Sequence, residues 1–338
     1  MKKLLYGLAV FALMMQSCQK QEEKTASGLS KSNFQTVING DSTDLYVLKN
    51  AAGMEVCITN FGGRIVSIMV PDKAGKMQDV VLGFDSVADY INVPSDFGAS
   101  IGRYANRINQ GKIIIDADTI QLPQNNFGHC LHGGPQGWQY QVYQTVNQID
   151  ATTIEMTRFS ADGDQNFPGN VNAKVTFKLT EDNAIDIKFE ATTDKKTVIN
   201  MCNHSYFNLS GDANNPITDN VLYINADTYT PVDSTFMTTG AIDSVKGTPM
   251  DFVTPKVIGQ DIDKFEFAQM KNGNGYDHNW VLNTAGDVTK LAAKVTSPAS
   301  GIGVEVYTNE PGIQVYSGNF LDGTAKGKKG IVYKQRTG

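Results

Sequence analysis

The most informative stretch for the fold is KVTFKLTEDNAIDIKFE, residues 174–190. In residues 174–179 the apolar side chains Val, Phe and Leu alternate with Lys and Thr, and in residues 185–190 Ile and Phe alternate with Asp, Lys and Glu. A period of two is typical of strands buried on one face of an antiparallel sheet. The polar residues 181–183 between the two halves are a turn signal. The stretch therefore predicts a β-hairpin.

The same period recurs along the chain, and helical periodicity is scarce. Further strands are predicted at residues 54–59, 65–70, 112–115, 142–146, 153–159, 198–202, 221–226, 281–283, 304–308 and 314–318, and short helices at 86–91 and 262–269. After residue 32 no composition shift, long linker or fixed-period repeat divides the chain. The sequence thus predicts one all-β domain over residues 33–338, a large antiparallel β-sandwich with few short helices.

The N-terminus has the composition of an export signal. Within residues 1–17 two lysines precede a short apolar run, which predicts a signal peptide. Cys18 follows Met-Gln-Ser, which resembles the cleavage and lipidation site of a bacterial lipoprotein, although an ordinary secreted protein is the alternative. Residues 19–32 are polar and predict a flexible tether. We therefore expect an exported protein, a periplasmic or outer-membrane lipoprotein anchored through Cys18.

Charge and cysteine usage narrow the possible partners. The 338 residues carry a formal net charge of −6, which argues against nucleic acid or an anionic membrane surface as a partner. If Cys18 is lipidated, the other three cysteines are too widely spaced for a disulfide framework or a zinc pattern. His129 and His132 lie three apart without an accompanying H-E-x-x-H motif. The sequence therefore predicts no metal site.

Several polar side chains lie in motifs that suit a neutral polyol. Such a ligand needs paired hydrogen-bonding groups and aromatic faces for its C–H surfaces. The candidate residues are Asn106, Arg107, His132, His204, Asp277 and Glu310. Each motif alone is equally compatible with a turn or a hydrogen-bonded core residue. Their combination is the feature that indicates a sugar.

Taken in order, these motifs resemble the aldose 1-epimerase (galactose mutarotase) family. They are NRI at 106–108, LHGG at 131–134, NHSYFNL at 203–209, YDHN at 276–279, EPG at 310–312 and GNF at 318–320. The resemblance extends from about residue 60 to the end of the chain. It implies the galactose mutarotase-like β-sandwich with an open cleft for a sugar. It also implies interconversion of the α and β anomers of a free aldose without a cofactor.

The resemblance also implies roles for individual residues. His204 would be the general acid at the ring oxygen, and His132 would assist from the neighbouring side. Arg107 and Asp277 would hold sugar hydroxyls, and Asn106 belongs to the same binding motif. These assignments are carried over by position in the motifs.

One departure concerns the general base. In the family this base is a Glu in a Leu-Glu-Thr-Gln-like motif, and the chain ends at Gly338 about where that motif would begin. We therefore expect a truncated reading frame that lacks the C-terminal end of the domain. Glu310, at a position that in the family contacts the anomeric region, is the only substitute carboxylate that the motifs offer.

The expected function is that of an isomerase, an aldose 1-epimerase acting on free aldohexoses (glucose or galactose) in hexose metabolism, as a monomer or homodimer. One alternative is a non-catalytic carbohydrate-binding module on the same fold, which would use Arg107, His132 and Asp277 without a base. Another is a glycoside hydrolase or lyase, which needs two opposed carboxylates. Asp277 and Glu310 are the only obvious pair for that chemistry.

Overall fold

The computed structural model of the protein describes residues 24–338, and the predicted hairpin supplies its two longest strands. β14 (Val171–Leu179) and β15 (Ile185–Thr193) pair antiparallel, with Val171 opposite Thr193 and Leu179 opposite Ile185. Along β14 every second side chain is buried, beginning with Val171. The hairpin is therefore confirmed, because the apolar side chains of β14 form one buried face.

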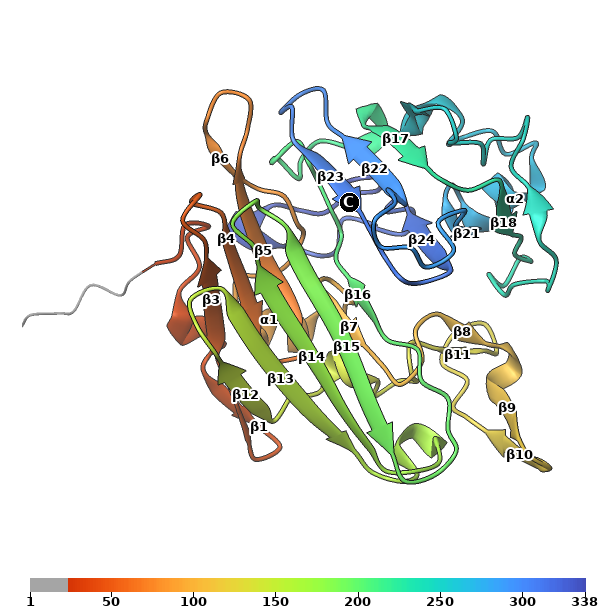
Figure 1. The fold of residues 1–338 in the computed structure, drawn as a ribbon, viewed down its shortest axis with the longest axis horizontal. Helices are drawn as coiled ribbons and strands as arrows, with labels where there is room; N and C mark the ends of the chain where they lie inside the picture. The colour runs from red at the N-terminus through yellow and green to blue at the C-terminus, as the bar shows by residue number, and fades with distance from the viewer. Residues whose placement is uncertain (1–23) are drawn as a thin grey trace, which may run out of the picture.

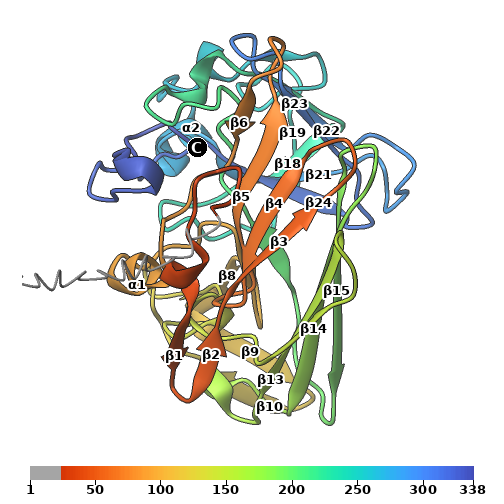
Figure 2. The ribbon, with the colours of Figure 1, turned by 90° about the vertical axis from the view of Figure 1, so that its left-hand side faces the viewer.

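Two four-stranded antiparallel sheets pack against each other around an apolar core. The first has the order β3 (Leu45–Lys49), β4 (Glu55–Thr59), β5 (Arg64–Pro71) and β6 (Met77–Asp79), and the second the order β12 (Thr145–Gln148), β13 (Thr153–Ser160), β14 and β15. Ile58 and Ile68 of the first sheet share a buried cluster with Met156 and Phe177 of the second. Figure 2 shows the first sheet in orange beside the second in green. Each fully buried side chain of this size stabilises the fold by about 1.5–3 kcal/mol.

A second pair of four-stranded sheets extends the sandwich (Figure 1). One has the order β20 (Lys256–Val257), β17 (Val221–Ile224), β22 (Ala293–Thr296) and β23 (Gly303–Val306), and the other the order β19 (Asp243–Ser244), β18 (Thr228–Thr230), β21 (Asp277–Val281) and β24 (Gly312–Tyr316). Ile224, Phe252 and Trp280 lie in the core of this part. Ile302, beside β23, belongs to the first core. The two parts are therefore in contact, and the predicted all-β sandwich is confirmed.

Short elements complete the described part of the chain. Two-stranded sheets pair β1 (Thr36–Ile38) with β2 (Asp41–Thr43), β7 (Ala99–Ile101) with β16 (Cys202–His204), β8 (Arg107–Ile108) with β11 (Cys130–Leu131), and β9 (Lys112–Ile115) with β10 (Asp118–Gln121). The two α-helices of residues 24–338 are α1 (Val87–Asn92) and α2 (Ala268–Gly273), and 3-10 helices lie at Lys31–Phe34, Asn109–Gly111, Trp138–Tyr140, Asp164–Asn166, Ile217–Asp219, Ile258–Gln260 and Lys328–Gly330. Within these residues no helix is long and apolar enough to cross a membrane.

Several predicted boundaries differ from the structure. The predicted strand at 198–202 begins only at Cys202, because before it Asn200 forms an isolated bridge to Tyr104. The strand predicted at 281–283 is the end of β21, which starts at Asp277. The predicted strand at 142–146 and helix at 262–269 are shifted along the chain, to β12 and α2.

Part of the predicted tether is packed on the sandwich. The predicted signal peptide and Cys18 lie outside the described residues, as do the first residues of the tether. Leu29 is buried in an apolar cluster with Phe34 and Leu45. The backbone N–H of Ala26 donates to the Glu55 carboxylate at 2.6 Å. Residues 24–32 therefore do not form a flexible tether, because Leu29 supplies the apolar anchor that the polar composition concealed.

Candidate active site

The short strands β7 and β16, which lie side by side in Figure 1, pair antiparallel and place His204 at the start of β7. His204 lies opposite Ala99 in this pairing, and the backbone N–H of Gly98 donates to the His204 carbonyl at 2.9 Å. Asp96 begins the turn that enters β7, where its carbonyl accepts the Ala99 N–H at 3.1 Å. The Asp96 carboxylate therefore lies close to a ring nitrogen of His204, within 4.8 Å.

A second short pairing brings His132 to the same place. β8 pairs with β11 so that Arg107 lies opposite Leu131, and His132 directly follows β11. The backbone N–H of Asn106 donates to His132 Nδ1 at 3.0 Å. The rings of His132 and His204 are perpendicular, with their centroids 5.0 Å apart. Two imidazoles thus face each other.

The hydrogen bond from Asn106 determines the tautomer of His132. Because Nδ1 accepts an N–H, the neutral ring carries its proton on Nε2. Burial lowers the pKa of His132 to about 4, an effect that the Asp96 charge opposes and that His204 and Arg107 reinforce. His132 is therefore a neutral ring at neutral pH, and it can donate a hydrogen bond from Nε2.

Arg107 is half-buried and held in place by two contacts. Its Nε and Nη2 donate to the Asn126 side-chain oxygen at 3.1 and 2.9 Å, and its guanidinium lies 4.9 Å from the centroid of the Phe236 ring. Burial lowers the pKa of Arg107, while Asp277 and Asp233 act in the opposite direction. Within residues 24–338 no acceptor binds Nη1. The guanidinium therefore keeps N–H groups for a ligand.

Asp277 contributes a second carboxylate from β21. The side-chain amide of Gln314, on the neighbouring strand β24, donates to Asp277 Oδ1 at 2.8 Å. Burial raises the pKa of Asp277, against the hydrogen bond from Gln314 and the positive charges of Arg107 and His204. The charges of Arg107 and His204 therefore both act on the Asp277 carboxyl group.

Aromatic rings form a wall beside the cluster. Tyr206 stacks on His204 with ring centroids 5.3 Å apart. Tyr206 and Tyr316 are nearly perpendicular, in a T-shaped pair with ring centroids 5.6 Å apart. Tyr316 and Phe320 lie nearly parallel at 6.4 Å, and Phe236 contacts Phe320 at 5.5 Å. Phe320 remains 54% exposed. The wall therefore offers an accessible aromatic face beside polar groups, an arrangement that suits the C–H face of a sugar.

The structure does not bring Glu310 to this cluster. In the pairing of β21 with β24, Asp277 lies opposite Tyr316 and Val281 opposite Gly312. At about 3.3 Å per residue, the Gly312 end lies about 13 Å along the strands from Asp277. Glu310 is exposed and lies two residues beyond Gly312. The contribution of Glu310 to the site therefore stays a prediction.

Asn106 supports the site through its backbone. Its N–H holds His132, and its side-chain oxygen accepts the Arg107 N–H at 2.8 Å. Asn106 adopts a left-handed conformation with φ of 61°, which Asn tolerates better than most residues. Asn106 therefore shapes the turn that presents both Arg107 and His132.

The other two histidines are structural. The backbone N–H of Gln110 donates to His129 Nδ1 at 3.0 Å, and His129 Nε2 lies 2.8 Å from the Thr235 hydroxyl. His278 is fully buried beside Trp280, and burial lowers its pKa to about 4. Both rings lie outside the cluster around His204.

The residues that were not predicted from the sequence include Asp96 and Gln314, together with Asn126, Phe236 and Tyr316, which hold Arg107 or form the aromatic wall. Gln314 lies in a strand that the sequence predicts, and alternation along β24 places it on the same face as Tyr316. Alternation along the predicted strand could therefore have placed Gln314 beside Tyr316. Asp96 precedes a strand of only three residues, and no local pattern marks it.

Asp96, His132 and His204 also have the residue types of a metal site. Their candidate ligand atoms all lie within 4.8 Å of one another. A metal ligand needs a free lone pair on the nitrogen that binds the ion. His132 Nδ1 is occupied by the Asn106 N–H, and Nε2 carries the proton of the neutral ring. The tautomer therefore fits a hydrogen-bonding cluster better than a metal centre.

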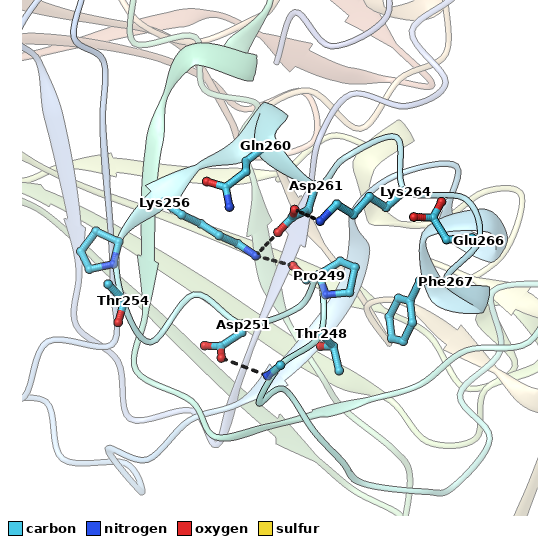
Figure 3. Close-up of a pocket in the computed structure, with 12 residues that line it drawn as sticks. Thr248, Pro249, Asp251, Thr254, Lys256, Gln260, Asp261, Lys264, Glu266 and Phe267 are labelled. Atoms are coloured by element: carbon cyan, nitrogen blue, oxygen red, sulfur yellow. Dashed lines mark hydrogen bonds and ion pairs between the residues drawn. The ribbon is translucent and has the colours of Figure 1, made fainter.

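A separate hollow contains charged groups that are paired with one another. It is lined by residues of the segment 247–267 (Figure 3). Lys256 and Lys264 both reach the Asp261 carboxylate, at 2.6 and 2.7 Å, and Lys256 also donates to the Pro249 carbonyl. Because Asp261 is shared by both lysines, its charge is already compensated. These contacts connect neighbouring loops.

The fold and this cluster define a class of protein. It is a large antiparallel β-sandwich that carries histidines, carboxylates and an arginine beside an aromatic wall. Comparison with known proteins specifies the family. A profile described as aldose 1-epimerase matches residues 44–337. Aldose 1-epimerase of Escherichia coli K12 is 39% identical over 286 residues, which cover 85% of this chain and 82% of that protein. Human galactose mutarotase is 38% identical over 285 residues, covering 84% and 80%.

Solved structures agree with this result. An aldose epimerase homologue from C. elegans superimposes with a TM-score of 0.78 at 30% identity, covering 87% of each chain. Galactose 1-epimerase from Lactobacillus acidophilus NCFM gives 0.76 at 30% identity, covering 86% of this chain and 82% of that one. The chain therefore belongs to the aldose 1-epimerase family, a family of isomerases, and the resemblance in the motifs is confirmed.

Proposed function

We propose that the protein interconverts the α and β anomers of free aldohexoses such as glucose and galactose, and so acts in hexose metabolism. The observation that carries the proposal is the facing pair of imidazoles, in which His132 is held neutral and His204 lies beside carboxylates. The relatives named aldose 1-epimerase and galactose mutarotase support the same reaction.

The proposed mechanism is acid–base ring opening and reclosure. His204 acts as the general acid at the sugar ring oxygen while a carboxylate takes the proton of the anomeric hydroxyl. The bond between C1 and the ring oxygen breaks, the C1–C2 bond rotates, and reclosure on the other face gives the opposite anomer. His132 donates a hydrogen bond from Nε2, and Arg107 and Asp277 hold hydroxyls. Each acid–base partner contributes about 10²–10⁴-fold.

Polarimetry of freshly dissolved α-D-glucose and α-D-galactose tests this proposal. We expect the protein to accelerate the approach to anomeric equilibrium in proportion to its concentration. A folded protein that binds galactose in calorimetry without accelerating this approach would instead be a non-catalytic carbohydrate-binding module. Release of reducing ends from an oligosaccharide would indicate the hydrolase alternative.

We also propose a subcellular localisation. The protein would be an exported lipoprotein, periplasmic or in the outer membrane and anchored through Cys18. This localisation is supported by the two lysines, the apolar run and the cysteine near the N-terminus. Cell fractionation with a Cys18→Ala variant tests this localisation. We expect the parent protein in the membrane fraction and the variant outside it, and an equal distribution of both would contradict the lipid anchor.

A further inference from the structure

The aromatic wall continues past Phe320 to a ring that the proposed mechanism does not use. Phe236 contacts Phe320 on one side and Phe127 on the other, where the ring centroids are 5.6 Å apart. Phe127 is 63% exposed, whereas Phe236 is nearly buried. His204 contacts the opposite end of this series of rings, through Tyr206. The wall therefore ends in an accessible aromatic face at the end remote from His204.

Both of these rings lie at backbone positions that phenylalanine rarely occupies. Phe127 has a φ of 47° and Phe236 a φ of 63°, in the left-handed region that is strained for bulky side chains. Phe127 and Gly128, which also has a positive φ, form the two-residue turn between Asn126 and His129. Turns of this kind favour Asn, Asp or Gly at the first position. Strained residues cluster at ligand-binding sites, so the Phe127 ring is a candidate for ligand binding.

A chain of hydrogen bonds holds the two turns against each other. His129 Nδ1 accepts a backbone N–H, so the proton on Nε2 faces the Thr235 hydroxyl oxygen at 2.8 Å. The Thr235 hydroxyl in turn donates to Asp233 Oδ1 at 2.5 Å. Thr235 directly precedes Phe236, and His129 lies two residues after Phe127. The two rings therefore form a surface that is already in place before a ligand binds, which lowers the entropic cost of binding.

Polar groups with unused hydrogen-bonding capacity lie beside these rings. Asn126 holds Arg107 with its side-chain oxygen, and within residues 24–338 its Nδ2 makes no hydrogen bond. Asp233 is exposed and uses Oδ1 within its own turn, and in the same part of the chain its Oδ2 has no partner. Arg107 lies over the Phe236 ring, and the charge of Asp233 acts on it. A donor, an acceptor and an aromatic face are the groups that bind a sugar unit.

We propose that the surface formed by Phe127 and Phe236 is a subsite for a second sugar unit, so that the protein prefers reducing disaccharides and oligosaccharides to free monosaccharides. This inference rests on the proposed function, in which His204 acts at the ring oxygen beside C1. In a pyranose, C4 lies across the ring from C1, so a unit attached through O4 extends away from His204. Because Arg107 contacts both Asn126 and Phe236, a first unit that it holds leads directly to this subsite.

The experiment compares D-glucose with cellobiose, which carries a second glucose on O4 of the same reducing unit. Anomer exchange measured by NMR gives kcat/KM for each sugar. We expect the wild type to have a higher kcat/KM for cellobiose than for glucose. We expect Phe127→Asn to lower the value for cellobiose by about 3–10-fold and to change the value for glucose by less than about twofold. Asn suits the left-handed turn, so the melting temperature should not fall.

Phe159→Ala is the control, because Phe159 is also exposed but lies on β13 of another sheet, and it should match the wild type with both sugars. Equal losses for glucose and cellobiose in Phe127→Asn would assign the ring to the first sugar unit and overturn the proposal. A wild type that shows no preference for cellobiose would also overturn it. Both results leave the proposed function intact.

Calorimetry gives a second result that does not depend on turnover. A wild type that accelerates neither sugar would refute the proposed function. In that case, tighter binding of cellobiose than of glucose, lost in Phe127→Asn, would still support the subsite. Equal affinities for the two sugars in the wild type would overturn it.

Discussion

The cluster of Asp96, His132 and His204 and the hollow of Figure 3 both gather charged groups, but they differ in how those groups are partnered. In the hollow, one carboxylate, that of Asp261, binds two lysines, and its charge is compensated within the fold. In the cluster, Oδ1 of Asp96 is buried and, within residues 24–338, has neither a hydrogen bond nor an ion pair. Asp261 Oδ1 also lacks a hydrogen bond, but it forms the ion pair with Lys264.

This difference distinguishes these two places, although an unpaired buried atom alone does not mark function, since Nε2 of the structural His278 is also buried without a partner within residues 24–338. A paired charge has already gained its interaction energy when the protein folds, and a ligand must compete with that pair. An unpaired buried group retains its hydrogen-bonding capacity for a ligand. The hollow is therefore a connection between loops, whereas the cluster is prepared for a substrate. Substitutions in the hollow, in the core and in the cluster should therefore differ in whether they change stability or catalysis.

Removing the shared carboxylate of the hollow should affect stability alone. Asp261→Asn leaves the nearly buried Lys256 without its ion pair. We expect a loss of about 3–5 kcal/mol in the free energy of unfolding, the usual cost of removing one partner of a buried pair. Urea unfolding measures this loss, and kcat per folded molecule should equal that of the wild type. A large fall in kcat without loss of stability would place function in the hollow.

The buried His278 should make stability depend on pH. Its pKa is lowered from 6.5 to about 4 by burial, so between these values the unfolded chain binds more protons than the folded one. Stability is complete above pH 6.5 and falls as the pH decreases to 4, by about 3 kcal/mol from this ring. Urea unfolding of the wild type and of His278→Asn at both pH values isolates the effect. Equal pH dependence in the two proteins would show that His278 does not titrate in this way.

His132 and His129 differ in their hydrogen-bond partners, so their substitution should have opposite effects on catalysis and on stability. His132→Asn keeps an acceptor for the Asn106 N–H but removes the Nε2 donor, so kcat should fall by about 10²-fold with the fold intact. His129→Asn is the matched control, because both nitrogens of His129 have protein partners. It should lower the melting temperature and leave kcat unchanged. The reverse pattern, measured by polarimetry and thermal unfolding, would invalidate the comparison.

The exposed face of the aromatic wall should contribute to sugar binding. Truncating Phe320 to Ala removes a ring next to Tyr316, and we expect KM to rise by about 2–10-fold, equivalent to about 0.5–1.5 kcal/mol. Phe159→Ala is the control, since Phe159 is similarly exposed (48%, against 54% for Phe320) but lies on β13 of another sheet. Unchanged KM values for both variants would exclude the wall from the binding site.

The sequence predicts the large sheets well because side-chain alternation has a direct physical cause. Residues 171–179 bury every second side chain, and the same pattern is visible in the sequence. The short strands that build the site are different. β7, β8, β11 and β16 contain two or three residues each, too few for any period, and they form because their neighbours hold them.

The site residues that lie in the family motifs could be predicted from the sequence. His132 and His204 come together in the structure, and Arg107 and Asp277 join them through charge. The place of Glu310 depends on the register of β21 with β24, which one sequence does not reveal, and its role at the site stays a prediction. Asp96 was missed because its role depends on a pairing with residues more than 100 positions away.

The most direct test of the account measures exchange between the anomers of D-galactose at equilibrium by NMR, in the presence of wild type, His204→Asn and Asp261→Asn. Equal amounts of folded protein, verified by circular dichroism, are compared. The account predicts rapid exchange with wild type and with Asp261→Asn, and exchange with His204→Asn at least about 10²-fold slower. Exchange with His204→Asn as fast as with the wild type would contradict the central claim that this cluster performs the acid–base chemistry.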